Sequence, residues 1–414
     1  MAAIANLTTL NALLKTLYPQ SDITKMFYEN APFLAMVPKA KDFKGNVAQI
    51  ALRYSTTQGR SQDFATAQNN ATAAAYAKWL LTRAHDYSIF NIDNETLLAA
   101  KDKGAIVEGL ETEVDAAMDA IKRALQIDLY GNAGGSRGYG NGAWVVTGTV
   151  ITLGRIQDIV NFEANMVLQA ATTDGTSGAI KKGTVTVLGV DRDLGTITLT
   201  AAANAGIATI ANTDFLFQAG DFLSAKSKIM GLGGWIPATA PITGDNFFGL
   251  DRSVDPYRLA GVRFTANNSL AGQAIEESLQ RAATRIAREG GRPTHAFLNN
   301  DDYLALQLSL GSRLAYTEAT TDVGVGFKGI EVAAGSVMLK CFADPNCPQG
   351  TCFVLQLDTW KLWSLGECPM FLGEAGDGLR MLRNPTTDSF QGRIGYYAQL
   401  YCTAPGYNGR IATP

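Results

Sequence analysis

A single long amphipathic helix constrains this chain more than any other feature of its sequence. From Gly104 to Tyr130 apolar residues recur at alternating steps of three and four, the period of one helix face. Acidic residues come early in the stretch and Lys122 and Arg123 come late, as the helix macrodipole favours. At about 1.5 Å per residue the helix would be roughly 40 Å long, so it would span a whole domain. The apolar stripe consists of Val107, Leu110, Val114, Ala117, Met118, Ile121, Ala124, Leu125 and Leu129.

The helix leads into a glycine tract that ends at Gly142. A dinucleotide-binding loop is excluded, because such a loop follows a strand and opens a helix. From Ala143 to Leu232 the composition changes to Thr, Val, Gly and Ala, and short strand-like segments alternate with turn residues, the last two being 208–211 and 214–220. This pattern predicts an inserted small β-barrel or β-sandwich domain over 143–232. The glycines at its two borders are predicted hinge residues: Gly131, Gly134, Gly135, Gly231, Gly233 and Gly234.

Two carboxylates in "DRDLG", Asp191 to Gly195, have the spacing of a calcium loop. No third Asp or closing Glu follows them, and strand-like segments flank them on both sides. The segment is therefore interpreted as a hairpin turn.

An arm and a hairpin are predicted before the long helix. Residues 1–44 contain Pro32 and Pro38 and favour an extended arm that must lie on another part of the assembly. Residues 45–93 contain two strand-like segments around a polar tip at 56–75, which predicts one long hairpin. Because a two-stranded hairpin is marginally stable in water, we expect it to pack on a neighbouring subunit.

A second helix is predicted within residues 269–291, with Ile275, Leu279, Ala282 and Ile286 on one face and Gly290 as its C-cap. Arg281, Arg285 and Arg288 line the other side, as a solvated helix face or as a contact between subunits. A strand, a turn and a helix follow in "THAFLNNDDYLALQLSL", and strands and loops dominate from Gly329 to the end.

The balance of charge and the residue inventory exclude several classes of protein. With 35 basic and 38 acidic residues the formal charge is −3, which argues against a chain that grips nucleic acid over its whole surface. No apolar run approaches the roughly 20 residues that span a bilayer. The two histidines, His85 and His295, lie in unrelated contexts, and no GxSxG, HExxH or phosphate-loop motif occurs. The chain is therefore not expected to be an enzyme or to hold a cofactor.

Five cysteines fall in the last fifth of the chain, and their odd number excludes a complete disulfide framework. Cys341, Cys347 and Cys352 could contribute to a zinc site, but no CxxC pair is present. Buried thiols, or thiols that merely lie in a loop, are the preferred interpretation, so no metal site is expected.

The order of these parts resembles the major capsid proteins of tailed bacteriophages, whose Hong Kong 97-type fold encapsulins share. The resemblance rests on the arm, the long hairpin, the long helix from Gly104 to Tyr130 (the spine helix) and the arginine-bearing helix. It also rests on the residue patterns of "NAPFLAMVPK", "RPTHAFLNNDDYLALQ" and "TAPGYNGRIA". It implies an α+β fold with an N-terminal arm, an extended hairpin loop, a peripheral domain and an axial domain, to which this chain adds the inserted β domain. The implied domains are 1–44 (arm), 45–93 (extended loop), 94–142 and 233–264 (peripheral domain), 143–232 (insertion), 265–385 (axial domain) and 386–414 (C-terminal strand segment).

The resemblance implies a structural subunit that self-assembles into pentamers and hexamers. These would form an icosahedral head around double-stranded DNA, assembled in the bacterial cytoplasm with a portal and a separate scaffolding or decoration protein as partners, without a membrane and without sequence-specific DNA binding. Some relatives crosslink subunits through lysine and asparagine, and the hairpin carries Lys78, Asn69 and Asn70. Candidate intersubunit contacts are Phe33, Arg53, Arg60, Asp63, Lys78, Trp79, Arg281, Arg285 and Arg288. An encapsulin-like compartment and a tail or adhesin protein are the alternatives.

Overall fold

Strand β22 (Ser389–Cys402), the longest strand in the described part of the chain, organises a six-stranded sheet. The structure is a computed structural model, and it describes residues 31–94, 103–264, 274–311, 316–320, 326–335, 337–372 and 381–413. β4 (Ala84–Asp93) pairs antiparallel with the first ten residues of β22. Three further strands pair with parts of β22: β19 (Trp360–Ser364), β20 (Met370–Phe371) and β21 (Met381–Arg383). The short strand β1 (Lys39–Ala40) joins the sheet by pairing with β19.

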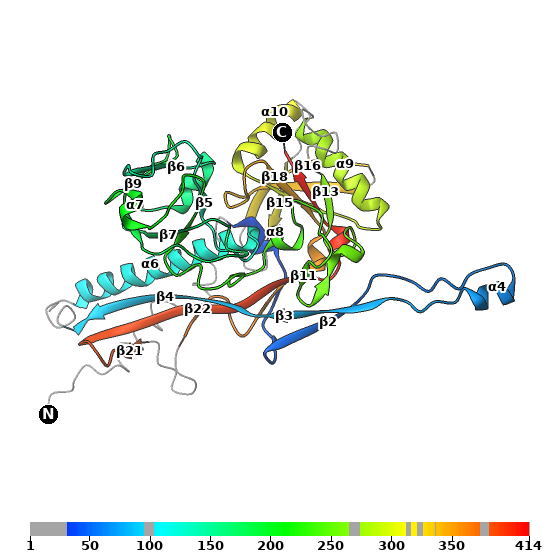
Figure 1. Cartoon of the computed structure of the whole chain (residues 1–414), viewed down its shortest axis with the longest axis horizontal. Helices are drawn as coiled ribbons and strands as arrows, with labels where there is room; N and C mark the ends of the chain where they lie inside the picture. The colour runs from blue at the N-terminus through cyan, green and yellow to red at the C-terminus, as the bar shows by residue number, and fades with distance from the viewer. Residues whose placement is uncertain are drawn as a thin grey trace.

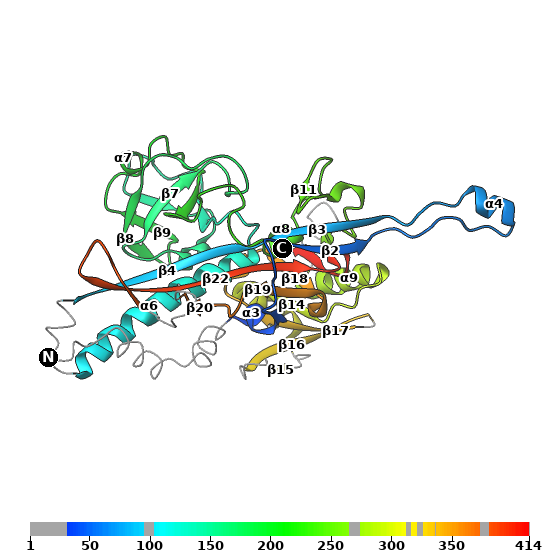
Figure 2. The ribbon, with the colours of Figure 1, turned by 90° about the horizontal axis from the view of Figure 1, so that it is seen from below.

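The predicted long helix is present as α6 (Lys103–Tyr130), and it lies along the β4–β22 sheet (Figures 1 and 2). Val114, Ile121, Leu125 and Leu129 of the predicted stripe are buried. Val107 and Leu110 lie outside the residues whose side chains the structure describes. The helical periodicity thus identified both the element and the face that it buries.

The hairpin consists of β2 (Val47–Arg53) and β3 (Tyr76–Thr82), which pair antiparallel from Val47↔Thr82 to Arg53↔Tyr76. It extends far from the rest of the molecule, and its tip carries a short helix, α4 (Phe64–Asn69), that the sequence did not predict (Figures 1 and 2). The hairpin is shorter than the predicted 45–93. Residues 84–93 belong instead to β4, because they form ten backbone pairs with β22 and their Ala84 and Phe90 side chains lie in the main hydrophobic core.

A six-stranded antiparallel sheet covers residues 138–218 in the order β5-β10-β7-β8-β9-β6. A bridge between Gly140 and Leu153 joins the two outer strands, so the sheet closes into a small barrel with a core of its own. The barrel begins inside the glycine tract, earlier than the predicted boundary at Ala143. Its strands are β5 (Gly138–Tyr139), β6 (Val150–Thr152), β7 (Val167–Ala171), β8 (Val185–Asp191), β9 (Thr196–Leu199) and β10 (Phe215–Gln218), with η1 (Ile156–Asn161) and α7 (Ala203–Gly206) between them.

The hairpin turn predicted for "DRDLG" is confirmed. It joins β8 to β9, and the Asp191 carboxylate accepts hydrogen bonds from the backbone N–H groups of Asp193 and Leu194, both at 3.0 Å. The strand predicted at 208–211 is wrong, because Thr209 adopts a positive φ of 59° that a strand does not permit.

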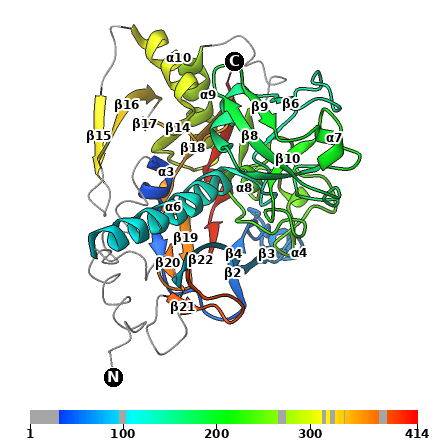
Figure 3. The same cartoon turned by 90° about the vertical axis from the view of Figure 1, so that its left-hand side faces the viewer.

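A seven-stranded mixed sheet forms a second body, in the order β13-β23-β18-β14-β17-β16-β15. Helix α9 (Ile275–Arg288) packs on it together with α10 (Asn300–Leu310), which caps its first turn with Asn299. The strands are β13 (Val262–Phe264), β14 (His295–Leu298), β15 (Tyr316–Thr320), β16 (Gly326–Ala334), β17 (Val337–Ala343), β18 (Thr351–Leu355) and β23 (Gly409–Ala412). This body and the barrel stand on the same side of the β22 sheet (Figures 1 and 3).

The predicted border of the axial domain at residue 385 does not follow the sheets. β19, β20 and β21, placed in that domain by the sequence, pair with β22, whereas β23 from the C-terminal segment lies inside the seven-stranded sheet. Segment 386–414 therefore belongs to both bodies, and the chain crosses between them several times.

Residues 31–43 are packed, although an extended arm was predicted for them. α3 (Pro32–Met36) places Phe33 and Leu34 in the main core, and Phe43 is buried as well. The rest of the predicted arm, residues 1–30, lies outside the described residues.

The remaining short elements connect the bodies. They are α8 (Leu232–Trp235), β11 (Asn246–Phe247), β12 (Leu250–Asp251), η2 (Arg252–Val254), η5 (Leu357–Thr359) and η6 (Pro405–Tyr407). Within the described part of the chain, no helix combines the length and the apolar character needed to cross a membrane.

Candidate assembly surfaces

The tip of the hairpin, residues 56–75, is exposed and carries one large apolar side chain, that of Phe64. None of the six residues of α4 is buried, and the Phe64 side chain is 82% exposed. Tyr76, the first residue of β3 after the tip, is 71% exposed. Asp63 caps α4 by accepting a hydrogen bond from the Thr66 backbone N–H at 2.9 Å. This cap lowers the pKa of the Asp63 carboxyl, chiefly through that backbone hydrogen bond. The tip has a defined local structure but no core to rest on.

Other predicted contact residues of the hairpin also lie at its surface. Arg53 and Arg60 are exposed, and Lys78 donates a hydrogen bond to the Gln49 side chain across the two strands at 3.0 Å. Trp79 is different, because it points to the opposite face of β3 and is fully buried in this chain. Trp79 is thus a core residue, and the prediction of an intersubunit contact for it is corrected.

The base of the hairpin is fixed by aromatic packing. Trp79 meets the rings of Trp235 and Phe247 edge to face, with centroids 5.4 Å and 5.7 Å apart. The Leu80 backbone N–H donates to the carbonyl oxygen of Phe248 at 2.9 Å. The Arg258 guanidinium donates to the carbonyl oxygen of Tyr54 at 2.7 Å, where β2 ends. These contacts fix the direction of the hairpin at its base, whereas none of the residues of α4 at its tip is buried in this chain.

Phe33 is also part of this chain's own core. Its ring packs against Tyr130 and Phe297, with centroids 5.5 Å and 5.3 Å apart, and no part of it is left for a second subunit. Nearby, the buried Asp344 carboxylate accepts a hydrogen bond from the Tyr130 hydroxyl at 2.8 Å. Burial raises the pKa of both groups. Asp344 ties α6 to the seven-stranded body.

The three arginines of α9 do not form a single surface. Arg281 pairs with Glu277 one turn earlier at 2.6 Å, and Arg285 donates to the Tyr257 hydroxyl at 2.8 Å. Arg288 is exposed on the last turn. The C-cap of α9 is Glu289, one residue before the predicted Gly290. Gly290 follows it with a φ of 93°, and the N–H of Gly291 donates to the Ile286 carbonyl oxygen at 3.1 Å, so a glycine ends the helix. Of the three arginines, Arg288 is the most available to another chain.

The glycines at the borders of the barrel pack closely against other backbone. A Cβ atom on Gly231 would overlap the carbonyl oxygens of Asp128 and Leu129, and one on Gly134 would overlap the carbonyl oxygen of Asp174. Gly234 donates its N–H to the carbonyl oxygen of Gly131 at 3.2 Å, so the chain leaves and rejoins α6 at the same place. Gly135 has a φ of 83°, and a Cβ atom on Gly233 would lie 2.9 Å from the Tyr130 carbonyl oxygen. These glycines permit close approach of backbone, which is a different role from a free hinge.

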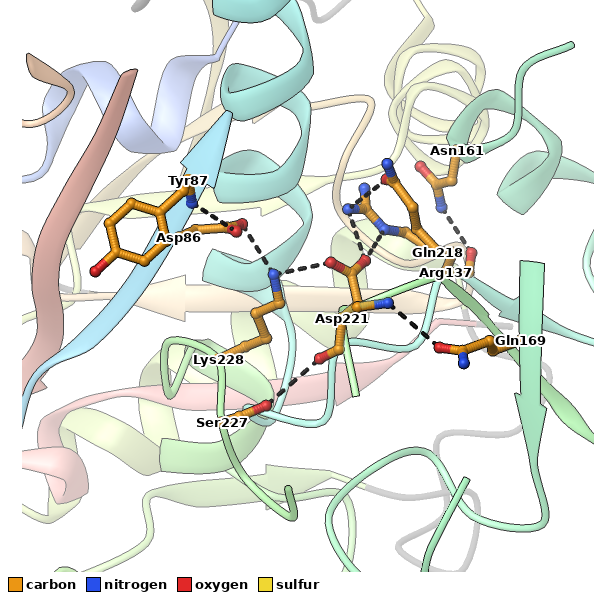
Figure 4. Close-up of polar contacts among 10 residues, drawn as sticks. Asp86, Tyr87, Arg137, Asn161, Gln169, Gln218, Asp221, Ser227 and Lys228 are labelled. Carbon is orange, nitrogen blue, oxygen red and sulfur yellow. Dashed lines mark hydrogen bonds and ion pairs between the residues drawn. The ribbon is translucent and has the colours of Figure 1, made fainter. Parts of the chain in front are cut away.

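A buried network of charges lies at this junction, and the sequence interpretation missed it. Asp221 accepts from the Arg137 guanidinium at 2.9 Å and from Lys228 Nζ at 2.8 Å, and Lys228 also pairs with Asp86 of β4 at 2.8 Å (Figure 4). Asp128 of α6 is buried beside them, and its Oδ2 atom is among the buried polar atoms of the described residues that lack a hydrogen-bond partner. One signal could have revealed it: Asp128 follows Leu125 by three residues and so interrupts the apolar stripe.

The network perturbs the pKa of its members. Burial raises the pKa of the Asp128 carboxyl to about 7, although Lys228 and Arg137 oppose this shift. Burial alone would lower the pKa of Lys228, but the carboxylates of Asp128, Asp221 and Asp86 raise it. Arg137 and Lys228 therefore stay charged, and Asp128 is the member that titrates near neutral pH.

All five cysteines are buried free thiols, and burial raises the pKa of each. Cys341 and Cys352 lie in β17 and β18, and the Cys347 thiol donates to the carbonyl oxygen of Thr351 at 3.3 Å. Among the residues that the structure describes, no three His, Cys, Asp or Glu side chains are grouped to hold a metal ion.

Three solved structures illustrate what this chain is similar to. The cyanophage A-1(L) capsid asymmetric unit matches with 12% identity and a TM-score of 0.49 over 92% of each chain. The capsid of a native GTA particle matches with 8% identity and a TM-score of 0.44, covering 93% of this chain and 90% of that chain. The holo-SrpI encapsulin complex from Synechococcus elongatus PCC 7942 has 7% identity and a TM-score of 0.42, covering 93% of this chain and 88% of that chain.

No protein-family model matches the chain, and no curated protein matches it either. The solved structures that it resembles are capsid proteins of phages and an encapsulin, the group that the sequence pointed to. At this level of similarity, function has to be inferred from the geometry of this chain itself.

Proposed function

We propose that this chain is the shell subunit of a tailed-bacteriophage head, and that its copies assemble into pentamers and hexamers that close an icosahedral shell around double-stranded DNA. Assembly would take place in the bacterial cytoplasm, with a portal and a separate scaffolding or decoration protein as partners. The work of such a subunit is mechanical, so its function lies in surfaces that bind other copies.

The observation that carries this proposal is the hairpin. Its base is fixed by Trp79 and the Arg258–Tyr54 hydrogen bond, whereas its tip presents Phe64 to solvent far from the body. An isolated two-stranded ribbon has little core of its own and is marginally stable in water, so it needs another surface to pack on. A tip of this kind is stabilised when it lies on the surface of another copy.

The charge of the chain is consistent with a container for DNA. A formal charge of −3 gives no general attraction to phosphate, so the shell would confine DNA without holding it tightly. Exposed Arg53, Arg60 and Arg288 remain available for contacts between subunits.

Electron microscopy of the expressed protein tests the proposal. Closed icosahedral shells are the expected result, with pentameric and hexameric capsomers visible in class averages. Shells that exclude DNA during phage infection would instead indicate an encapsulin-like compartment, and tubes or fibres would indicate a tail protein. A chain that stays monomeric at all concentrations, alone and with phage partners, would contradict any shell function.

Removal of residues 56–75 tests the role of the hairpin. Because none of the residues in α4 is buried in this chain, replacing the tip with a four-residue Gly/Ser turn should leave a folded, soluble subunit that fails to close shells. The matched control replaces the exposed turn between β8 and β9 in the barrel, which should assemble normally. Intact shells from the tip deletion would disprove this role.

A further inference from the structure

The charge network at the junction of α6 and the barrel contains one carboxylate more than it has cations. Asp86, Asp128 and Asp221 face Arg137 and Lys228. Asp221 and Asp86 are both paired, at 2.8 to 2.9 Å, and the Arg137 side chain also donates to Gln218 at 3.4 Å. Lys228 bridges Asp86 and Asp221, and Arg137 pairs with Asp221, so both cations are occupied by these two carboxylates (Figure 4).

Asp128 is the carboxylate left over. It is buried on α6, and its Oδ2 atom has no hydrogen-bond partner. If Asp128 is ionised, the buried network carries a net negative charge, and an unpaired buried charge is strongly unfavourable. If Asp128 holds a proton, the network is neutral.

The elements around Asp128 differ in how firmly they are held. Asp86 comes from β4 and Tyr396 from β22, and ten backbone pairs join these two strands. Asp221 and Lys228 come from segment 219–228, which lies in no helix or strand. This segment borders a cavity of about 450 Å³, and its Leu223 side chain is 85% exposed. Because no ladder of backbone pairs holds segment 219–228, we expect this segment, among the elements around Asp128, to be the one that moves and admits water.

We propose that Asp128 is a proton-operated latch: while it carries a proton, segment 219–228 is held against α6 and β4, and loss of the proton releases the segment. The groups that face Asp128 are Asp86 of β4, Arg137 of the glycine tract, Asp221 and Lys228 of the segment, and Tyr396 of β22. Since 219–228 follows β10 directly, release loosens the attachment of the barrel to α6.

The latch opens in a defined pH window. In the closed state burial raises the pKa of Asp128 to about 7, and when water reaches the group its pKa returns towards the ordinary value of about 3.9. Between these values the closed state binds one proton more than the open state. Stability of the closed state therefore falls as pH rises from about 4 to about 7, and it is constant above that range.

Hydrogen exchange measured on the whole chain tests the latch. Protection factors of the backbone N–H groups in 219–228, corrected for the intrinsic pH dependence of exchange, should fall about tenfold per pH unit between pH 5 and pH 7 and level off above. Asp128→Asn, which keeps the shape and removes the titration, should give high protection at every pH. The matched control is Asp158→Asn: burial also raises the pKa of Asp158, to about 6, but Asp158 lies in η1 of the barrel, and this variant should keep the slope of the unmodified chain.

The unmodified chain alone can overturn the inference. Protection in 219–228 that does not change between pH 5 and pH 7, or that changes equally in Asp128→Asn, would do so, whether or not the protein forms shells. Circular dichroism tests whether Asp128→Asn is folded. If the variant is unfolded, the pH dependence of exchange in the unmodified chain still tests the inference.

Discussion

At the scale of single residues, the tightest constraint lies where the chain rejoins α6. Gly231 has an ordinary φ of −82°, so its conformation does not require glycine. Its neighbours do, because the carbonyl oxygens of Asp128 and Leu129 occupy the space of a Cβ atom. The sequence marked Gly231 as a flexible position, and the structure shows that it permits close packing.

Gly231→Ala should therefore destabilise the protein by about 1–3 kcal/mol, the usual cost of forcing extra volume into packed structure. Gly189→Ala in β8 is the matched control, since nothing lies within 4 Å of the position of its Cβ atom. Urea unfolding of both variants, followed by circular dichroism, provides the comparison. Equal stability of the two variants would show that the backbone at Gly231 can shift at little cost.

Single residues also show what the sequence could and could not predict. The apolar stripe of α6 was predicted from its period, because side chains on one helix face recur every three or four residues. Phe33 and Trp79 were misplaced at an interface, because a large apolar residue in an arm or a hairpin has the same sequence signature whether its own chain or a partner covers it. Asp128 interrupts the stripe, but the two cations of its network, Arg137 and Lys228, are 9 and 100 residues further along the chain. Nothing in the sequence around Asp128 indicates that these residues lie beside it.

At the scale of elements, the chain combines local structure that its sequence predicts with pairings that it does not. α9 with Gly290 after its C-cap and the β8–β9 hairpin follow from neighbouring residues. β4 and β22 do not: Tyr87 and Tyr397, whose hydroxyls lie 3.2 Å apart across these strands, are separated by 310 residues. Backbone hydrogen bonds carry no sequence information about the partner strand, so β4 was assigned to the hairpin that precedes it.

The tip helix α4 is the element most dependent on a single side chain. With six residues and none of them buried, it relies on the Asp63 cap, which also accepts from the Thr66 hydroxyl at 2.8 Å. Asp63→Ala should unfold the tip, leave the unfolding temperature of the subunit unchanged and slow the formation of shells. Light scattering follows assembly, and exchange of the Thr66 N–H reports the cap.

Asp63→Asn serves as the control for this prediction, because asparagine caps helices about as well as aspartate. Normal assembly by Asp63→Asn with slow assembly by Asp63→Ala assigns the effect to the cap. Slow assembly by both variants would mean that the negative charge of Asp63 itself contacts another subunit.

At the scale of the whole molecule, exposed side-chain contacts supplement the junction between the barrel and the rest of the chain. Besides the junction, Gln157 donates to Asp301 of α10 at 2.7 Å, and Arg123 of α6 pairs with Glu163. Both contacts are exposed, and exposed pairs of this kind contribute little stability. The barrel also has a hydrophobic core separate from the main one. Its removal should therefore leave the rest of the chain folded, provided that the junction is kept.

The structure gives the boundaries for that removal. The Arg137 N–H donates to the Leu216 carbonyl oxygen at 2.9 Å, so the chain enters and leaves the barrel side by side there. Replacing residues 138–218 with a short Gly/Ser linker keeps Arg137, Asp221 and Lys228, and with them the buried network. Replacing residues 143–232, the boundaries that composition suggested, removes Asp221 and Lys228 and leaves Arg137 without the carboxylate it pairs with. Leaving a buried charge unpaired costs about 3–5 kcal/mol.

The 138–218 replacement should retain the helical signal in circular dichroism and still form capsomers, whereas the 143–232 replacement should lose much of that signal or unfold at a clearly lower temperature. Comparing the two variants separates the barrel from its junction, since both lack most of the barrel. They differ at the junction itself, because the 143–232 replacement also removes the charged segment and the main-core residues Ile229, Met230 and Leu232. Loss of the helical signal in the 138–218 variant would show that the barrel belongs to the main core. Equal stability of the two variants would show that the charge network is dispensable, because α6 and β4 would then hold together without the segment that bridges them.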